Sequence, residues 1–442
     1  HMDSNEMIRL CKAHTMYSWS AGNAVDPIPI TGAEGIYFWG PDNRKILDFN
    51  SHVMSVNVGH GHPRVIEAVQ RQLDVLPFAM PGSATEVRAR LGKLMAEITP
   101  GDIDVFFFTC SGAEANENAI KAARWFTGRH KILSRYRSYH GATHAAAMLT
   151  GDPRRIPNEP GAQGFVKVMD PRPYTYSFGE TDAEKTEQNL RYLEEVIHYE
   201  GPEQIAAMFI ETVTGTNGVL PPPEGYLKGL RALLDRYGIL LVCDEVMAGF
   251  GRTGKMYAFE HAGIVPDIVT MAKGLTSCYQ SLGAMGMRQK IADHFKDNVF
   301  YGGLTYNSHP SGLAAAEACI HVLRDEGLIE NAAQLEPVMR EEMERLRATH
   351  PSVKEGRVIG LFGILDLQRD SAGKRLAPYG HHSAVGDAFK ARLLELGLYT
   401  YVRWSEFMCI PPLCITEEEL RHAFAIIDEA LEVVDAAFEG GS

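Results

Sequence analysis

The chain has 442 residues, which is long enough to bury a large core and to form two or three domains. Hydrophobic residues make up 45% and charged residues 22%, values that are typical of a globular protein and argue against a disordered one. The 43 basic residues against 56 acidic ones give a formal net charge of −13, which argues against nucleic acid or an anionic membrane as a partner.

The seven cysteines are scattered without a CxxC pair, a distribution that is typical of reduced thiols. No stretch approaches the roughly 20 apolar residues that are needed to span a bilayer. The first residues also lack the basic-then-apolar pattern of a signal peptide. We therefore expect a cytoplasmic protein with no disulfide framework.

Residues 1–62 are polar and rich in turn residues, and they are predicted to form an N-terminal arm and a segment of a small domain. The stretch 35–49 holds two apolar runs around Pro41-Asp42-Asn43, which predicts a hairpin. Tyr17 and Trp19 are candidate walls of a substrate pocket, although such aromatic residues more commonly lie exposed or in a core.

Three histidines in this arm, His52, His60 and His62, raise the alternative of a metal-dependent hydrolase. An HxH pair on a glycine-rich loop with no nearby acidic partner is weaker than the ligand spacings of known metal sites. Histidine more commonly caps a helix or makes a hydrogen bond. We therefore predict no metal site.

Residues 63–325 alternate helical patterns with short apolar runs, which is typical of a mostly parallel sheet flanked by helices. We predict that this segment is the large domain. The predicted strands lie at residues 104–110, 130–136, 204–213, 238–246 and 266–272.

The first of these strands runs directly into Ser111-Gly112-Ala113, and helical spacing follows. Small residues at a helix start expose backbone N–H groups that bind an anion such as phosphate. The alternative is an ordinary serine N-cap, which explains this segment better when it is taken alone. The apolar run that holds the second strand leads to Tyr139, where an aromatic side chain can stack on a flat ring, although a lone aromatic there is more commonly part of a core.

Asp244 ends one apolar run and stands 29 residues before Lys273, which follows the next run. Parallel strands that end this way bring an acid and an amine into one crevice at the carboxyl edge of the sheet. A lysine amine forms a Schiff base with the aldehyde of pyridoxal phosphate (PLP), and a carboxylate keeps the pyridine nitrogen protonated. The pair alone is ambiguous, because most such charges are solvated.

Residues 249–256 fit both GxGxxG and GxxxxGK, which are nucleotide-binding patterns. The second pattern requires Ser or Thr after its lysine to hold Mg²⁺, and this chain has Met256 there. The glycines also come too late after the strand, and no long helical pattern follows them. We therefore predict a shaped loop and no nucleotide site.

Residues 326–442 return to a mixed pattern and are predicted to form a smaller α+β domain. A charged helix is expected around residues 336–350. Strands are expected at 360–367 and 396–404, and a helix from residue 417 to about residue 438.

The motifs SGAEANE, YHG, DEVMAGFGRTGK, PDIVTMAKGL and PPLCIT follow one another along the chain. In this order they resemble the class III (omega) aminotransferases of the PLP-dependent fold type I superfamily, over residues from about 33 to about 418. The resemblance implies an α/β large domain with a mostly parallel central sheet, plus a smaller α+β domain built from the N- and C-terminal segments.

The resemblance also implies roles for the residues that match the family motifs. Lys273 carries the cofactor and shuttles protons, Asp244 pairs with the pyridinium nitrogen, and Val246 lies against the ring face. Tyr139 stacks on the ring, and His140 and Glu211 belong to the cofactor site. The phosphate is expected to bind to Ser111, Gly112 and Ala113.

Two further implications concern the partner subunit and the substrate. Thr305 resembles the family threonine that reaches the phosphate of the other subunit, so a homodimer, possibly a tetramer, with interfacial active sites is expected. Arg403 resembles the arginine that receives a substrate carboxylate, and Arg137 is a second candidate receptor. Family departures at Thr212 and at residues 278–281 affect the substrate entrance.

The expected reaction is transfer of an amino group by a ping-pong mechanism. The donor is expected to be an ω-amino acid or aminosulfonate of the β-alanine, γ-aminobutyrate (GABA) or taurine type, and the acceptor pyruvate or 2-oxoglutarate. An acetylornithine- or diamine-type aminotransferase and a PLP-dependent aminomutase remain open. A PLP-fold transcription regulator requires a basic helix-turn-helix domain, for which this chain offers neither the length nor the charge.

Overall fold

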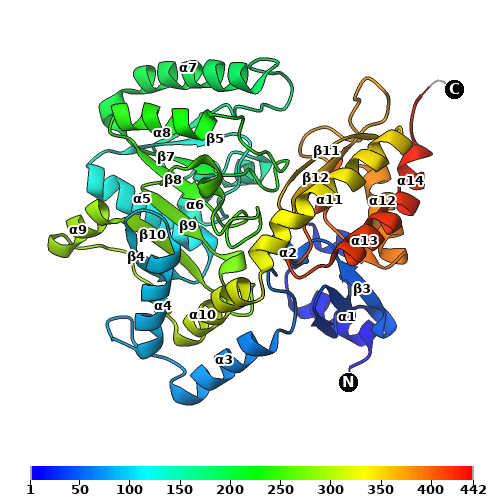
Figure 1. Ribbon diagram of the computed structural model, residues 1–442, viewed down its shortest axis with the longest axis horizontal. Helices are drawn as coiled ribbons and strands as arrows, with labels where there is room; N and C mark the ends of the chain where they lie inside the picture. Colours follow the sequence, from blue (N-terminus) through cyan, green and yellow to red (C-terminus); the bar gives the residue numbers. More distant parts are fainter. Residues whose placement is uncertain (1, 441–442) are drawn as a thin grey trace.

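The computed structural model describes residues 2–440, and its central feature is a seven-stranded sheet with the strand order β4-β10-β9-β8-β7-β5-β6 (Figure 1). All neighbours pair in parallel except β10, which is antiparallel to both β4 and β9. The strands are β4 (Ile103–Thr109), β5 (Lys131–Arg135), β6 (Phe165–Val168), β7 (Ile205–Glu211), β8 (Leu240–Asp244), β9 (Ile268–Met271) and β10 (Gly283–Arg288).

Helices cover both faces of this sheet because its strands are apolar on both sides. Along β7, Phe209 packs into one core cluster with Ala119 and Ile120 of α5 (Gly112–Thr127). Its neighbour Met208 points the opposite way, into a cluster with Leu230 of α8 (Tyr226–Arg236). This alternation fixes the sheet between two helical layers, as the sequence predicted.

The remaining helices surround the large sheet or belong to the smaller part of the molecule. They are α1 (Ser4–His14), α2 (Ser51–Met54), α3 (Pro63–Val75), α4 (Glu86–Ile98), α6 (His144–Leu149), α7 (Asp182–Glu200), α9 (Gln289–Asp297), α10 (Pro310–Asp325), α11 (Leu328–Thr349), α12 (Ala384–Glu395), α13 (Glu417–Ala430) and α14 (Glu432–Asp435). Short 3-10 turns are η1 (Gly22–Ala24), η2 (Pro41–Asn43), η3 (Pro153–Asn158), η4 (Pro202–Gln204), η5 (Ala258–Ala262) and η6 (Lys273–Leu275).

Two four-stranded sheets form the smaller part, which lies beside the large sheet in Figure 1. Their strands are β1 (Gly32–Glu34), β2 (Tyr37–Trp39), β3 (Lys45–Asp48) and β13 (Leu398–Tyr399) in one sheet, and β11 (Val353–Ile359), β12 (Phe362–Leu367), β15 (Glu406–Cys409) and β14 (Val402–Arg403) in the other. Strand β3 pairs in parallel with β13, so the N-terminal arm and the C-terminal segment share a sheet. The predicted domain boundaries stay a prediction.

Several local expectations are confirmed. The predicted hairpin is β2 paired with β3 across the turn at Pro41–Asn43. The glycine-rich loop after β8 leads only into the short turn η5, and Arg252 at its centre is fully buried. That arginine donates to the carbonyls of Leu361 and Pro411, which explains the shaped loop as a structural link between the two parts.

Within residues 2–440, none of the helices combines the length and the apolar character that crossing a bilayer requires.

Candidate active site

A cavity of about 740 Å³ opens at the carboxyl edge of the large sheet. Strands β4, β5, β7, β8 and β9 all end near it, which is where ligands bind in open α/β sheets. Predicted site residues that line this cavity are Trp19, Ser111, Gly112, Ala113, Tyr139, His140, Glu211, Asp244, Val246 and Lys273. The fold therefore brings ten predicted residues from distant parts of the chain into one place.

Asp244 is buried at the end of β8 and is held by three hydrogen-bond donors. Its Oδ2 accepts from Asn116 Nδ2 at 2.9 Å and lies 2.8 Å from His140 Nδ1. Its Oδ1 accepts from the N–H of Val246 at 2.9 Å. These contacts fix the carboxylate and compensate its desolvation. Asn116 was not predicted as a site residue, because an amide inside a helix resembles any other polar helical residue.

Lys273 begins the turn η6 with φ at +38°, a conformation that a side chain disfavours. Strain of this kind is commonly found at functional sites. The Nζ of Lys273 donates to the carbonyl of Val53 at 3.0 Å. Burial lowers the pKa of the Lys273 amine, against the opposing effects of Cys278 and Asp244. A lowered pKa leaves more of the amine in the neutral, nucleophilic form.

The predicted phosphate turn lies where α5 begins. The Ser111 hydroxyl accepts from the N–H of Glu114 at 3.2 Å, so Ser111 is an N-cap as well as a cavity residue. A Cβ placed on Gly112 would lie 2.9 Å from Val246 Cγ2. Glycine is therefore required here for the backbone of α5 to approach the Val246 side chain. The helix start lines the cavity, and the first N–H groups of a helix have no partner within it.

Tyr139, Arg154 and Trp19 form one wall of the cavity. The guanidinium of Arg154 lies 3.6 Å from the centre of the Tyr139 ring and 5.5 Å from that of Trp19. Asp152, which is fully buried, forms an ion pair with Arg154 at 2.6 Å. Arg154 is the functional candidate that sequence reasoning missed, because a charged residue in a loop after a short helix usually has a solvated side chain.

Glu211 ends β7 directly beside Asp244, its register partner on β8. Burial, followed by the charge of Asp244, raises the pKa of Glu211 to about 8. The N–H groups of Tyr139 and Gly215 each donate to its carboxyl group at 3.2 Å. At neutral pH Glu211 therefore retains its proton, while the neighbouring Asp244 carboxyl group is contacted by three hydrogen-bond donors.

Four predicted residues lie outside the lining of this cavity. Arg403 is buried and donates to the carbonyl of Thr216 at 3.0 Å, and Arg137 donates to the carbonyls of Arg172 and Asn217. Thr305 is exposed. Tyr17 lies against Cys11 of α1. Their predicted roles stay predictions, and the contacts of the two arginines favour Arg154 as the cation that faces the cavity.

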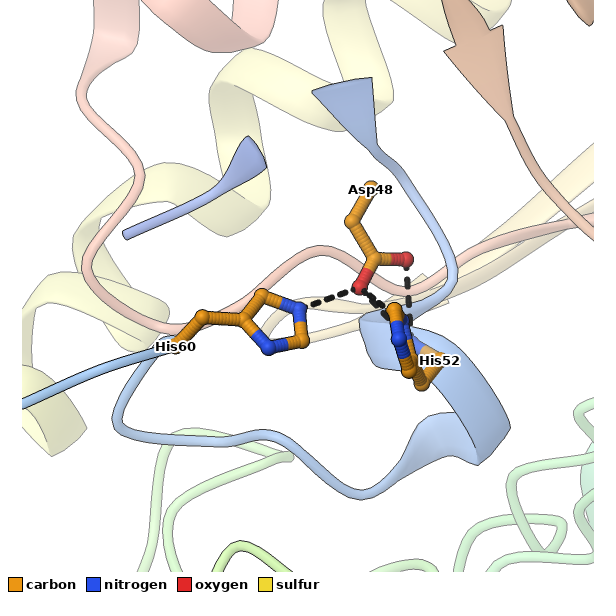
Figure 2. Close-up of side chains that lie close together, drawn as sticks. All are labelled: Asp48, His52 and His60. Carbon is orange, nitrogen blue, oxygen red and sulfur yellow. Dashed lines mark hydrogen bonds and ion pairs between the residues drawn. The ribbon is translucent and has the colours of Figure 1, made fainter. Parts of the chain in front are cut away.

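The expectation that the arm histidines lack an acidic partner is wrong. Asp48, at the end of β3, lies 2.7 Å from His52 Nδ1 and 2.7 Å from His60 Nε2 (Figure 2). These three residues form a group that could hold a metal ion. Ligand atoms around tetrahedral zinc are about 3.3 Å apart, so the present spacing is that of hydrogen bonds. His62 pairs instead with Glu326.

Comparison with known proteins identifies the family of this site. The model of the family described as aminotransferase class-III matches residues 19–431. The structure of the taurine:2-oxoglutarate aminotransferase from Bifidobacterium kashiwanohense, in complex with PLP and glutamate, superposes with a TM-score of 0.96 at 39% identity, covering 99% of each chain.

Two curated relatives have other donors in their names. The diaminobutyrate–2-oxoglutarate transaminase of Halomonas elongata is 32% identical over 93% of this chain and 92% of its own length. The mitochondrial γ-aminobutyrate transaminase 1 of Oryza sativa is 32% identical over 93% of this chain and 82% of its own length.

Proposed function

Because the chain belongs to the class III aminotransferases, which are PLP-dependent enzymes that move an amino group from a donor to a 2-oxo acid, we propose which substrates it uses. The proposed donor is an ω-amino acid or an aminosulfonate, of the β-alanine, GABA or taurine type. The proposed acceptor is pyruvate or 2-oxoglutarate, and the two half-reactions alternate in one pocket.

The residues of the cavity fit PLP. The turn at Ser111–Ala113 offers the phosphate a helix start with no Cβ at Gly112, and Asp244 offers a fixed carboxylate to the ring nitrogen. Bound PLP supplies an aldehyde that captures an amine and a ring that withdraws electrons from it. Lys273 would hold the cofactor through its ε-amine and, when free, move a proton between its Nζ and the substrate carbon.

Arg154 carries the proposal for the donor class. Asp152 and Thr216 engage the Nε and Nη2 side of its guanidinium, so the Nη1 side is left for a substrate anion within the described part of the chain. A guanidinium pairs well with a carboxylate or a sulfonate, because each carries negatively charged oxygens that accept hydrogen bonds from its N–H groups. Trp19 adds an apolar surface against which a short methylene chain can pack.

The similarity to a taurine:2-oxoglutarate aminotransferase over 99% of both chains supports the same donor class, and the GABA transaminase relative agrees with it. The diaminobutyrate relative acts on a diamino acid, and a donor with two amino groups stays the second candidate. A diamine that lacks a carboxylate would bring only a cation toward Arg154, which Coulomb repulsion disfavours.

The test is a donor panel measured on Arg154→Gln, with Arg155→Gln as the matched control. Arg155 is the next residue, pairs with Glu159 and lies outside the cavity lining. A charge-assisted hydrogen bond contributes about 1.5–3 kcal/mol, so kcat/KM for taurine, β-alanine and GABA should fall roughly 10- to 100-fold in Arg154→Gln. The control should match the parent enzyme.

The same panel separates the alternatives. Strong activity with putrescine or acetylornithine that survives Arg154→Gln would replace the proposal by a diamine-type aminotransferase. Transfer of the amino group to another carbon of the same molecule, with no acceptor consumed, would indicate an aminomutase. Each result is read by chromatography of the products, which reports the donor and acceptor directly.

A further inference from the structure

Asp48, His52 and His60 form a hydrogen-bonded cluster that we call the histidine clamp (Figure 2). Asp48 is fully buried, and both imidazole rings converge on its Oδ2. The backbone N–H of His52 donates to the same carboxylate, at 2.9 Å from each oxygen. His52 is therefore tied to Asp48 twice, once through its backbone and once through its ring.

The clamp holds a turn that has an unfavourable backbone conformation. Within α2, Ser51, His52 and Met54 have φ values of +46°, +57° and +55°. His52 also has ψ at −92°, close to the strained γ-turn with positive φ. Side chains disfavour this region, so surrounding contacts must impose it. The bonds from Asp48 to His52 supply that constraint.

The clamped turn leads directly to the catalytic lysine. Val53 follows His52, and its carbonyl accepts the hydrogen bond from Lys273 Nζ at 3.0 Å. Val53 and Met54 also line the active-site cavity. We propose that the histidine clamp is a positioning device, which fixes the Val53 carbonyl so that it orients the free ε-amine of Lys273 for its reactions.

The electrostatic surroundings are consistent with a fixed anion at the clamp. Burial lowers the pKa of Arg252, and the negative charge of Asp48 opposes this. Burial raises the pKa of Tyr399 to about 12, and Asp48 adds to it. The groups that face Lys273 itself are Asp244, Cys278 and Arg154. The printed hydrogen bonds of Asp244 and Arg154 go to residues outside the clamp, and His52→Gly leaves the Asp48 carboxylate in place, so a change at Lys273 in that variant can be attributed to the Val53 carbonyl.

The clamp makes two separate predictions for Lys273. A carbonyl acceptor favours the charged ammonium, so losing the Val53 contact should lower the pKa of this amine. Losing the orientation should reduce the limiting rate at which the free amine reacts. A role confined to folding would change protein stability and leave both quantities unchanged.

The experiment measures how fast the cofactor-free full-length enzyme captures PLP, across a range of pH, by absorbance. It uses Asp48→Asn and His52→Gly, since glycine tolerates the positive φ and keeps the chain foldable if the buried Asp48 variant fails. The matched control is His62→Asn, which lies in the same segment and retains an N-cap for α3. No amino donor is needed, so the result does not depend on which donor the enzyme uses.

Both clamp variants should shift the pH midpoint of capture downward by roughly half a unit or more and lower the limiting rate roughly tenfold. In the loaded enzyme, kcat should fall while KM changes less than about twofold. The double variant should be no worse than Asp48→Asn alone, because the His52 ring acts on the turn through Asp48.

Three outcomes would overturn the proposal. They are a midpoint that matches the His62→Asn control in the folded clamp variants, additive losses in the double variant, and one metal ion per chain that survives dialysis in the parent but is absent from Asp48→Asn. The last result would make the cluster a metal site.

Discussion

The ionisation of Glu211 should make the stability of the protein depend on pH. Its pKa is raised from an ordinary 4.5 to about 8 by burial and by Asp244. Between these values the unfolded chain loses this proton as pH rises while the folded chain keeps it. The contribution of Glu211 to the free energy of unfolding therefore falls with rising pH, by at most about 1.4 kcal/mol per unit, and levels off above pH 8.

We expect Glu211→Gln to remove this slope. The free energy of unfolding, measured by denaturant titration of the cofactor-free enzyme at pH 5, 6.5 and 8, should decline less for the variant than for the parent. The lost backbone hydrogen bond adds an offset that is independent of pH. Glu203→Gln, which changes an exposed carboxyl group in η4 just before β7, should behave like the parent. Parallel curves for parent and Glu211→Gln would contradict the raised pKa.

Site residues at the ends of strands could be located from the sequence, whereas site residues in loops could not. Asp244 and Lys273 follow apolar runs, so their place at the sheet edge follows from strand geometry. Arg154 lies in η3, where no periodic pattern fixes the direction of a side chain. Asp48 precedes His52 by only four residues, yet the turn that joins them has dihedrals that no local propensity favours.

One added methyl group can test the geometry at the start of α5. A Cβ at Gly112 would lie 2.9 Å from Val246, whereas one at Gly92 in α4 meets nothing within 4 Å. Relieving this contact must shift Val246 or the start of α5, and both line the cavity, so Gly112→Ala should weaken PLP binding by up to the roughly 10- to 100-fold that corresponds to an overpacking cost of about 1–3 kcal/mol. Gly92→Ala should instead stabilise α4 by about 0.5–1 kcal/mol.

Fluorescence titration with PLP and thermal unfolding distinguish the two variants. Weaker binding with an unchanged melting temperature in Gly112→Ala would place the strain in the cofactor site. Equal PLP affinity in both glycine variants would mean that the α5 start does not bind the phosphate.

Element prediction failed in the large sheet where a strand is short or lacks the usual composition. The sequence predicted β4, β5, β7, β8 and β9 from β-branched and aliphatic runs. It missed β6, which has four residues with Lys167 among them, and β10, in which two glycines and two methionines replace such residues. Close packing explains the glycines of β10, since a Cβ at Gly283 would lie 2.2 Å from the Ser111 carbonyl. The parallel direction of the predicted strands follows from the alternation of strands and helices along the sequence. The position of β10, as an antiparallel strand between β4 and β9, depends on tertiary contacts.

At the scale of the whole molecule, the active site depends on segments from both ends of the chain. The clamp and Trp19 come from the N-terminal arm, which is held by β13 of the C-terminal part. Only the family resemblance predicted that the N- and C-terminal segments form one domain. A two-residue strand such as β13 carries no periodic signal in the sequence.

A second chain is expected to complete each active site through Thr305. This threonine is exposed and lies outside the cavity of its own chain. Exposed apolar side chains nearby in sequence, Val299, Tyr301 and Tyr306, fit a surface that a second copy covers. Sedimentation should therefore give twice the mass of one chain.

Mixed dimers test the role of Thr305 directly. Lys273→Ala should bind no PLP covalently, and Thr305→Ala should bind it roughly five- to tenfold more weakly, which is the loss of about one hydrogen bond. In a co-expressed mixed dimer, one site combines the intact lysine of one chain with the intact threonine of the other. That site should regain parental affinity at half occupancy, because each variant supplies what its partner lacks. If the mixed dimer binds PLP only as weakly as Thr305→Ala does, the threonine acts within its own chain.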